Sequence, residues 1–211
     1  MGCLHFLPGG QNRLASRDFC DILLQQIYND LSRQYGSWTR RQLYDRNYGE
    51  TRIPRIPSAI LEMFSHQNYA DMKRALDPAF KFSLARSIYK GILRFVTSQH
   101  NQSALSVPPI VAPLPVHGFA VQADPINHHI RLSWKATVDS LDANAMPTSY
   151  IVYTRTQDKG WNNGIVVTDS IYDFEAPDSL LYQFRVEAVN DGGRSMPSET
   201  LCGRLTLTPD V

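Results

Sequence analysis

The apolar residues of this chain change their spacing once, near residue 97, and that change limits the possible folds more than any other feature. Before it, apolar side chains recur at the spacing of one helix face, as in FKFSLARSIYKGILRF at 80–95. After it, they alternate with polar residues in short runs, as in HIRLSWK at 129–135. Since one element cannot follow both periods, the sequence predicts a helix-containing unit followed by a β-sheet unit.

A segment without a hydrophobic period separates the two halves. The stretch TSQHNQSALSVPP at 97–109 is polar and then proline-rich, which is typical of a linker. Short alternating strands with regular turns follow it, as expected for a β-sandwich. We therefore expect an α/β segment over residues 1–96, a linker over 97–111 and a sandwich over 112–208.

The first half predicts long helices on either side of a short strand. One helix begins at Ser16, whose hydroxyl is placed to cap it, and ends at Gly36. A short apolar run bounded by prolines follows, and it predicts a buried strand that closes on the carboxylate of Glu62. The next long helix begins where Asp77 precedes Pro78, an N-cap followed by an N1 proline.

Charge and hydropathy exclude several classes of function. The chain carries 21 Lys and Arg against 20 Asp and Glu, and its net charge of +1 gives no electrostatic basis for binding nucleic acid. No apolar run is long enough to span a bilayer, and MGCLHFLPGG at the N-terminus lacks the basic and apolar regions of a secretory signal peptide. Cys3, Cys20 and Cys202 match neither a metal knuckle nor a disulfide framework, and we interpret Cys20 and Cys202 as small buried hydrophobic residues.

The second half resembles a fibronectin type III domain. The resemblance rests on Trp134 in an early strand, Tyr182 in a late strand and the turn NDGGRSMPSE at 190–199. It implies an all-β sandwich in which Tyr182 pins the late strand at a corner. Such a fold by itself indicates little about function.

The segment at 57–95 carries the motif with the most chemical content. It resembles the last strand and helix of the zinc-dependent N-acetylmuramoyl-L-alanine amidases, which cleave the muramoyl–L-alanine amide of peptidoglycan. The matching residues are Pro57, Ala59, Ile60, Leu61, Glu62, Asn68, Asp71, Ile88, Gly91 and Ile92. The resemblance covers nearly all of residues 2–96 and implies an α/β fold, here an incomplete sheet with flanking helices. Asn68 and Asp71 also match the ends of a capping box for a short helix.

The amidase resemblance implies roles for two polar side chains. In such enzymes a carboxylate beside the zinc takes a proton from the metal-bound water and later gives one to the leaving amine. Glu62 occupies that position, so it is the candidate catalytic residue. Arg52 lies where the family often has an arginine before the strand, which makes it a candidate for substrate binding. From the residue pattern alone, a capping or salt-bridging glutamate is the simpler interpretation of Glu62.

The resemblance implies zinc as a cofactor, but the sequence lacks the ligand motifs that the family places upstream of this segment. A catalytic zinc needs three protein ligands. His5 is the only histidine before Glu62, and its context, followed by Phe6 and Leu7, favours a strand histidine over a ligand. We therefore predict no metal ligands in this chain, no bound zinc and no amidase activity.

Three functions fit this organisation. The first is a remnant or fragment of a peptidoglycan amidase, of the periplasm or cell surface, with the sandwich as a spacer or wall-binding module. The second is a non-enzymatic binding or structural module that contacts peptidoglycan or another cell-surface glycan. The third is a xanthan-lyase-type polysaccharide lyase, because chains with a variant like Met63–His66 after the glutamate, followed by the same sandwich, form a branch that carries this label.

Overall fold

The computed structural model describes residues 1–5, 13–36, 38–100 and 109–205. The chain divides into two compact units, Met1–Pro109 and Ile110–Val211. Each unit has its own hydrophobic core. Among the described residues, no helix combines the length and the apolar character needed to cross a membrane.

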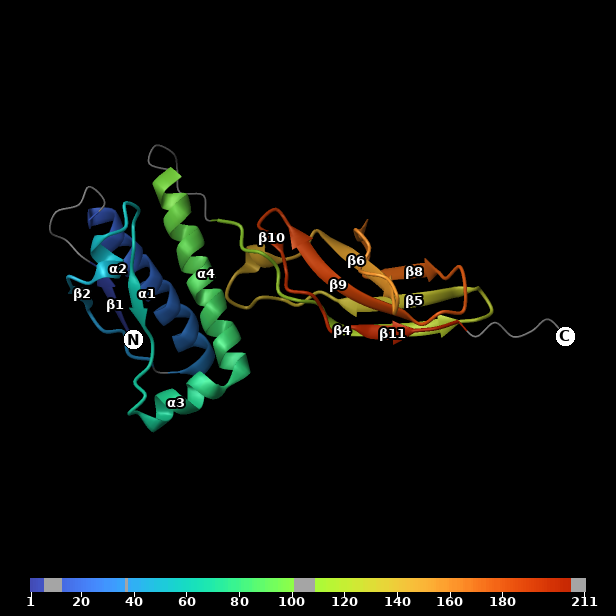
Figure 1. Ribbon diagram of the computed structural model, residues 1–211, viewed down its shortest axis with the longest axis horizontal. Coiled ribbons are helices and arrows are strands. Elements are labelled where there is room, and N and C mark those ends of the chain that lie inside the picture. The colour runs from blue at the N-terminus through green and yellow to red at the C-terminus, as the bar shows by residue number, and fades with distance from the viewer. Residues whose placement is uncertain (6–12, 37, 101–108, 206–211) are drawn as a thin grey trace. The chain divides into compact units, whose positions relative to one another are not determined.

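The first unit is a small mixed sheet with helices (Figure 1). Its sheet has the order β2-β1-β3, with β1 parallel to β2 and antiparallel to β3. The strands are β1 (Gly2–His5), β2 (Leu43–Asp45) and β3 (Ile60–Glu62). The helices are α1 (Arg13–Tyr35), α2 (Gly49–Arg52), α3 (Tyr69–Leu76) and α4 (Pro78–His100). An α/β segment is therefore present.

One face of this sheet packs against α1. The register aligns Cys3 with Leu43 and Leu61, and these side chains meet Cys20 and Leu24 of the helix. β3 is shorter and less buried than the strand expected around Glu62, since Ile60 and Leu61 are only half-buried. β3 is an edge strand of the three-stranded sheet, so a neighbouring strand covers it on one side only. This position explains its exposure.

Helices α1 and α4 lie side by side (Figure 1) and share a core around Ile27, Leu31, Phe80 and Leu84. Gly91 permits their close approach, because a Cβ at this position would lie 2.9 Å from Cδ2 of Leu23 and 3.2 Å from its Cα. The packed faces of the helices also hold an ion pair, in which Lys90 Nζ lies 2.8 Å from Oδ2 of Asp30.

The ends of α1 show where the sequence signals succeed and fail. Gly36 follows the last helical residue with φ of 81°, a left-handed conformation that glycine adopts without steric cost, so the predicted stop is confirmed. The predicted start at Ser16 is wrong, since the helix already contains Arg13. The hydroxyl of Ser16 is buried and accepts a hydrogen bond from the Ser58 amide. A long-range contact therefore uses the side chain that sequence reasoning assigned to a cap.

Helix α4 begins as predicted and ends later than predicted. Oδ1 of Asp77 accepts a hydrogen bond from the Ala79 amide, as an N-cap should. The buried face shifts along the helix to Gly91 and Phe95, leaving Ile92 43% exposed. Residues 97–100, which were expected to open the linker, continue the helix. Most of the remaining expected linker, 101–108, lies outside the described residues.

The second unit is a sandwich of antiparallel sheets (Figure 1). One sheet has the order β4-β5-β8; the other has the order β10-β9-β6-β7, with β11 also paired to β9. The first sheet contains β4 (His117–Asp124), β5 (His129–Lys135) and β8 (Ile171–Glu175). The second contains β6 (Ser149–Thr156), β7 (Ile165–Val167), β9 (Tyr182–Asn190), β10 (Gly193–Arg194) and β11 (Leu201–Gly203), and a 3-10 turn spans Ala143–Ala145. This two-sheet architecture is that of fibronectin type III domains.

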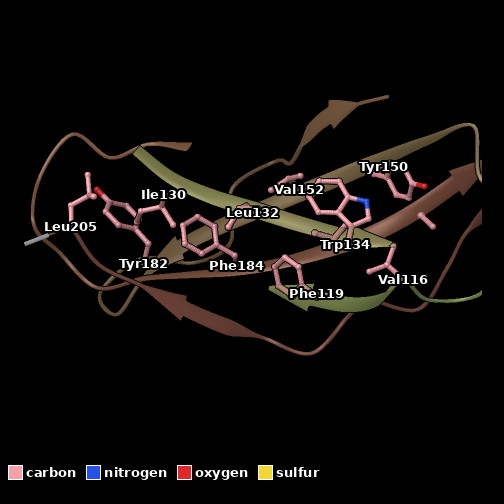
Figure 2. Packing of buried hydrophobic residues seen from close by; sticks show 12 residues of the cluster. Val116, Phe119, Ile130, Leu132, Trp134, Tyr150, Val152, Tyr182, Phe184 and Leu205 are labelled. Atoms are coloured by element: carbon pink, nitrogen blue, oxygen red, sulfur yellow. The ribbon is translucent and has the colours of Figure 1, made fainter. Parts of the chain in front are cut away.

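The inward-facing residues of both sheets form one core (Figure 2). Ile130, Leu132 and Trp134 of β5 are buried at alternate positions, as their spacing predicts. Trp134 packs edge-on against Tyr150 with ring centroids 5.3 Å apart. The hydroxyl of Tyr182 donates a 2.8 Å hydrogen bond to Oδ1 of Asp178, which holds the start of β9 to the turn before it.

The turn after β9 replaces part of the strand ladder with side chains. The hydroxyls of Ser195 and Ser198 accept hydrogen bonds from the Ala188 and Val186 amides, on either side of Pro197, which has no N–H to donate. The side-chain amide of Asn190 donates to the Val111 carbonyl at 3.0 Å. Because Val111 is also buried, the end of the expected linker belongs to the sandwich.

Candidate functional site

A cleft of about 470 Å³ lies in the first unit where β3 ends. Glu62 is the last residue of β3, pairs with Gly2 of β1 and is exposed. The position of this carboxylate at the strand end is as the sequence predicts. The lining residues are Met1, Gly2, Trp38, Thr39, Arg41, Glu62, Met63, Phe64, Ser65, Asn68, Ala70, Asp71 and Arg74.

One wall of the cleft combines a cation with aromatic rings. The guanidinium of Arg74 lies 4.9 Å from the ring centroid of Trp38 and 5.8 Å from that of Phe80. Trp38 in turn meets Phe64 edge-on at 6.5 Å. These contacts fix the orientation of the Arg74 side chain, because a cation over an aromatic face is held by the ring quadrupole.

Trp38 lines the cleft and also has an unpaired hydrogen-bond donor. Its Nε1 is buried and has no hydrogen-bond partner among the described residues. Buried polar groups in proteins nearly always have a partner, so the unpaired indole N–H is an unusual feature of a residue that lines the cleft. No motif in the sequence marks Trp38 as a site residue.

The polar side chains of the cleft that follow β3 make different hydrogen bonds. Asn68 caps α3 by accepting hydrogen bonds from the Ala70 and Asp71 amides, as predicted. Asp71 does not complete a capping box, since its Oδ2 accepts a 2.9 Å hydrogen bond from the Ser65 amide instead. This bond fixes the turn after β3. Glu62 is the more exposed of the two carboxylates.

Arg52 lies away from this cleft and is not among the residues that line it. It is the last residue of α2, and its guanidinium donates to Oδ1 of Asn47. The neighbouring Thr51 carbonyl accepts a hydrogen bond from Ser58, close to the start of β3, whereas Glu62 lies at the end of that strand. The structure thus does not bring Arg52 and Glu62 to one site.

The described residues do not fit a catalytic zinc centre. No group of three or more His, Cys, Asp or Glu side chains gathers in the part of the chain that the structure describes. His5 ends β1 opposite Asp45, at the other end of the strand from Gly2 and its partner Glu62. The His5 side chain is buried, and burial lowers its pKa below the usual value. The nearby Asp45 carboxylate raises this pKa and the Arg17 guanidinium lowers it, and the net shift is downward.

The second unit carries a row of cations and rings on β6, β9 and the loop after β6. The indole of Trp161 lies 4.6 Å from the Arg155 guanidinium and 4.5 Å from that of Arg185, which also lies 4.9 Å from the Tyr153 ring. Asn162 anchors the loop through a hydrogen bond that its side chain accepts from the Thr154 amide. The stacking occupies Trp161 within the domain.

The comparisons with known proteins concern solved structures alone. No protein family and no curated protein matches this sequence. Similar solved structures include domains A168–A170 of titin (27% identity, TM-score 0.38, covering 44% of this chain and 32% of that one). They also include FN3tt (22% identity, TM-score 0.38, covering 46% and 99%) and a human fourth FNIII domain (17% identity, TM-score 0.40, covering 52% and 91%). The chain spans less than a third of the titin structure.

Proposed function

We propose that this chain is a binding protein of the bacterial cell wall, in which the cleft beside Glu62 takes the peptide part of peptidoglycan. The observation that carries this proposal is the set of groups around one cleft: the Glu62 carboxylate, the Arg41 and Arg74 guanidiniums, and the ring of Trp38. The sandwich serves as a spacer or as a second binding module, which fits its self-contained core.

The chemistry of a cell-wall peptide matches these groups. Such peptides carry carboxylates, which guanidinium groups bind strongly, and amines, which a carboxylate binds. The resemblance of the segment at 57–95 to the peptidoglycan amidases supplies the ligand class, and the cleft supplies the complementary charges.

Hydrolysis of the muramoyl–L-alanine amide is the second candidate, and the place of Glu62 at the strand end and cleft favours it. Glu62 would act as the general base. The described residues do not assemble a zinc site that could activate water for this reaction. Binding requires only the groups that are present, and we therefore place it first.

Binding is tested on the full chain with a soluble muropeptide that keeps its free amine and carboxylates. Isothermal titration should show saturable binding, and Arg74→Ala should weaken it about tenfold, the usual cost of one charged hydrogen bond. Lys73→Ala is the matched control, because Lys73 is an exposed cation on the same helix and does not line the cleft. Glu62→Gln should also weaken binding, with Glu50→Gln of α2 as its control.

The three tryptophans give an independent readout. In a ¹⁵N-correlated spectrum, the indole signal of Trp38 should shift on titration, whereas those of Trp134 and Trp161 should stay in place. Absence of binding, or binding that leaves the Trp38 signal unmoved and ignores Arg74→Ala, would remove the basis for the proposal.

A further inference from the structure

Two buried thiols meet where the sheet of the first unit packs against α1. Sγ of Cys3, on β1, lies 2.8 Å from Sγ of Cys20, on α1. Both residues are fully buried, and both are free cysteines. The two cysteines are 17 positions apart in the sequence, so only the fold brings them together.

The surroundings hold the two sulfur atoms in place. Cys3 sits in the central strand, between Leu43 and Leu61 in the register, and Cys20 packs beside Leu24 in the same apolar cluster. Sγ of Cys20 also contacts the Leu4 carbonyl at 3.4 Å. The thiols are therefore not mobile side chains that meet by chance, and they face each other in a fixed apolar setting.

We infer that Cys3 and Cys20 are a covalent modification site, at which oxidation forms a disulfide that ties β1 to α1. This pairing could not be predicted from the sequence, since the spacing of the cysteines matches no disulfide framework. Disulfide formation needs the two sulfur atoms to reach bonding distance with little backbone movement, and the contact in the fold meets this condition.

The oxidant is a low-molecular-weight disulfide such as glutathione disulfide. The thiolate of one cysteine attacks a sulfur of the oxidant, forms a mixed disulfide and releases one glutathione thiolate. The second cysteine, after losing its proton, attacks the protein-bound sulfur and releases the second glutathione. The protein loses two electrons and two protons, and one oxidised glutathione becomes two reduced ones.

The timing of this reaction follows from burial. The hydrogen bond with Cys3, together with desolvation, raises the pKa of the Cys20 thiol above its ordinary value. A thiol that resists ionisation is a poor nucleophile, and a fully buried one is closed to the oxidant. Oxidation is therefore expected during folding, as α1 docks on β1 and the two thiols meet but are still open to the oxidant, and the finished disulfide is then protected from reductants.

The test refolds the full chain in a glutathione redox buffer and counts free thiols. Denatured, unreduced protein is alkylated with N-ethylmaleimide, and its intact mass is measured by mass spectrometry. We expect one alkyl group in most chains, at the exposed Cys202, and three after reduction. Peptide mapping should find Cys3 linked to Cys20. Three alkyl groups before reduction, or a disulfide that includes Cys202, would overturn the inference.

Variants separate this bond from other effects of oxidation. Cys202→Ser should keep the linked peptide, whereas Cys3→Ser and Cys20→Ser should each lose it. Reduction should lower the thermal midpoint of the wild-type first unit by on the order of 10 °C, because the disulfide closes a short loop. The midpoint of Cys202→Ser should fall equally, and that of Cys20→Ser should not respond. The mapping of the wild-type chain decides the question even if a variant fails to fold.

Discussion

At the scale of single residues, Tyr182 shows how one hydroxyl sets a pH limit on the sandwich. Its ring packs against Phe174 with centroids 4.9 Å apart, and its hydroxyl donates to Asp178. Desolvation, followed by the hydrogen bond to this carboxylate, raises the pKa of Tyr182 to about 12. The folded sandwich thus favours the protonated phenol, whereas the unfolded chain titrates near the ordinary tyrosine value of about 10.

We expect the stability that Tyr182 contributes to be complete below about pH 10 and to be lost as the pH rises toward 12, because only the unfolded state gives up the proton in that window. Urea unfolding between pH 8 and about 11.5 measures this. Tyr182→Phe should start about 1 kcal/mol less stable, having lost one hydrogen bond, and should show a shallower decline. If wild type and Tyr182→Phe decline in parallel, Tyr182 is not the group responsible.

Residue-level prediction from sequence worked where the signal was local. Asn68 caps a helix three residues ahead of Asp71, and Glu62 closes a short apolar run, so both were found from their neighbours in the chain. Trp38 and Arg74 were missed as site residues, because they contact each other, and Phe80, only in the tertiary fold. The cation of Arg74 carries no pattern that marks its aromatic partners.

At the scale of elements, the interface of α1 and α4 contains a buried ion pair. Its contribution to stability can be compared with that of an exposed ion pair on α1. Asp30 and Lys90 have side-chain exposures of 6% and 1%. Asp21 of α1 pairs with Arg40, and these side chains are 58% and 31% exposed. Burial reduces the screening of charge by water, so the two carboxylates should respond differently to neutralisation.

We expect Asp30→Asn to destabilise the first unit by about 3 kcal/mol, because it takes the carboxylate away from a buried ammonium. Asp21→Asn should cost less than about 1 kcal/mol, the usual value of an exposed pair. Chemical denaturation of both variants, followed by helical circular dichroism, compares them. Equal losses would mean that the buried pair is no more important than the surface pair.

The elements also show why boundaries were harder to predict than types. The helices were identified from their periods, but α1 starts before Ser16 because that hydroxyl bonds to Ser58 rather than to its own helix. α4 runs past Thr97 because helical hydrogen bonds continue through polar residues without a core face. The sandwich strands were easier, since alternation over β5 and β9 reports burial directly.

At the scale of the whole molecule, the two units each have a separate core and should unfold and resist proteolysis separately. Limited trypsin or subtilisin digestion should release a stable fragment that begins near residue 110, because the chain between the units is polar and proline-rich. Mass spectrometry locates the first cuts. Early cleavage within Ile130–Val186 would show that the sandwich is not an independent unit.

We predict that the whole chain has no amidase activity. The reaction needs a metal, a base and a groove, and Glu62 with the cleft supplies at most the last two. Removing part of a concerted site leaves little of its rate. Purified chain incubated with zinc should therefore release no stem peptide from peptidoglycan. Stoichiometric zinc, with peptide release that Glu62→Ala abolishes, would establish the hydrolase instead.

The serine-lined turn after β9 bears on how copies of the sandwich behave when they are crowded together. A long unbroken edge strand recruits the edge of a neighbouring molecule, and shared sheets then grow into fibrils. Here the edge beyond β9 consists of the short β10 and β11, with Pro197 between them and serine hydroxyls occupying backbone donors of β9. A foreign strand approaching this side finds no continuous row of partners, so the same residues that finish the fold also make this edge of the sheet a poor template for another copy.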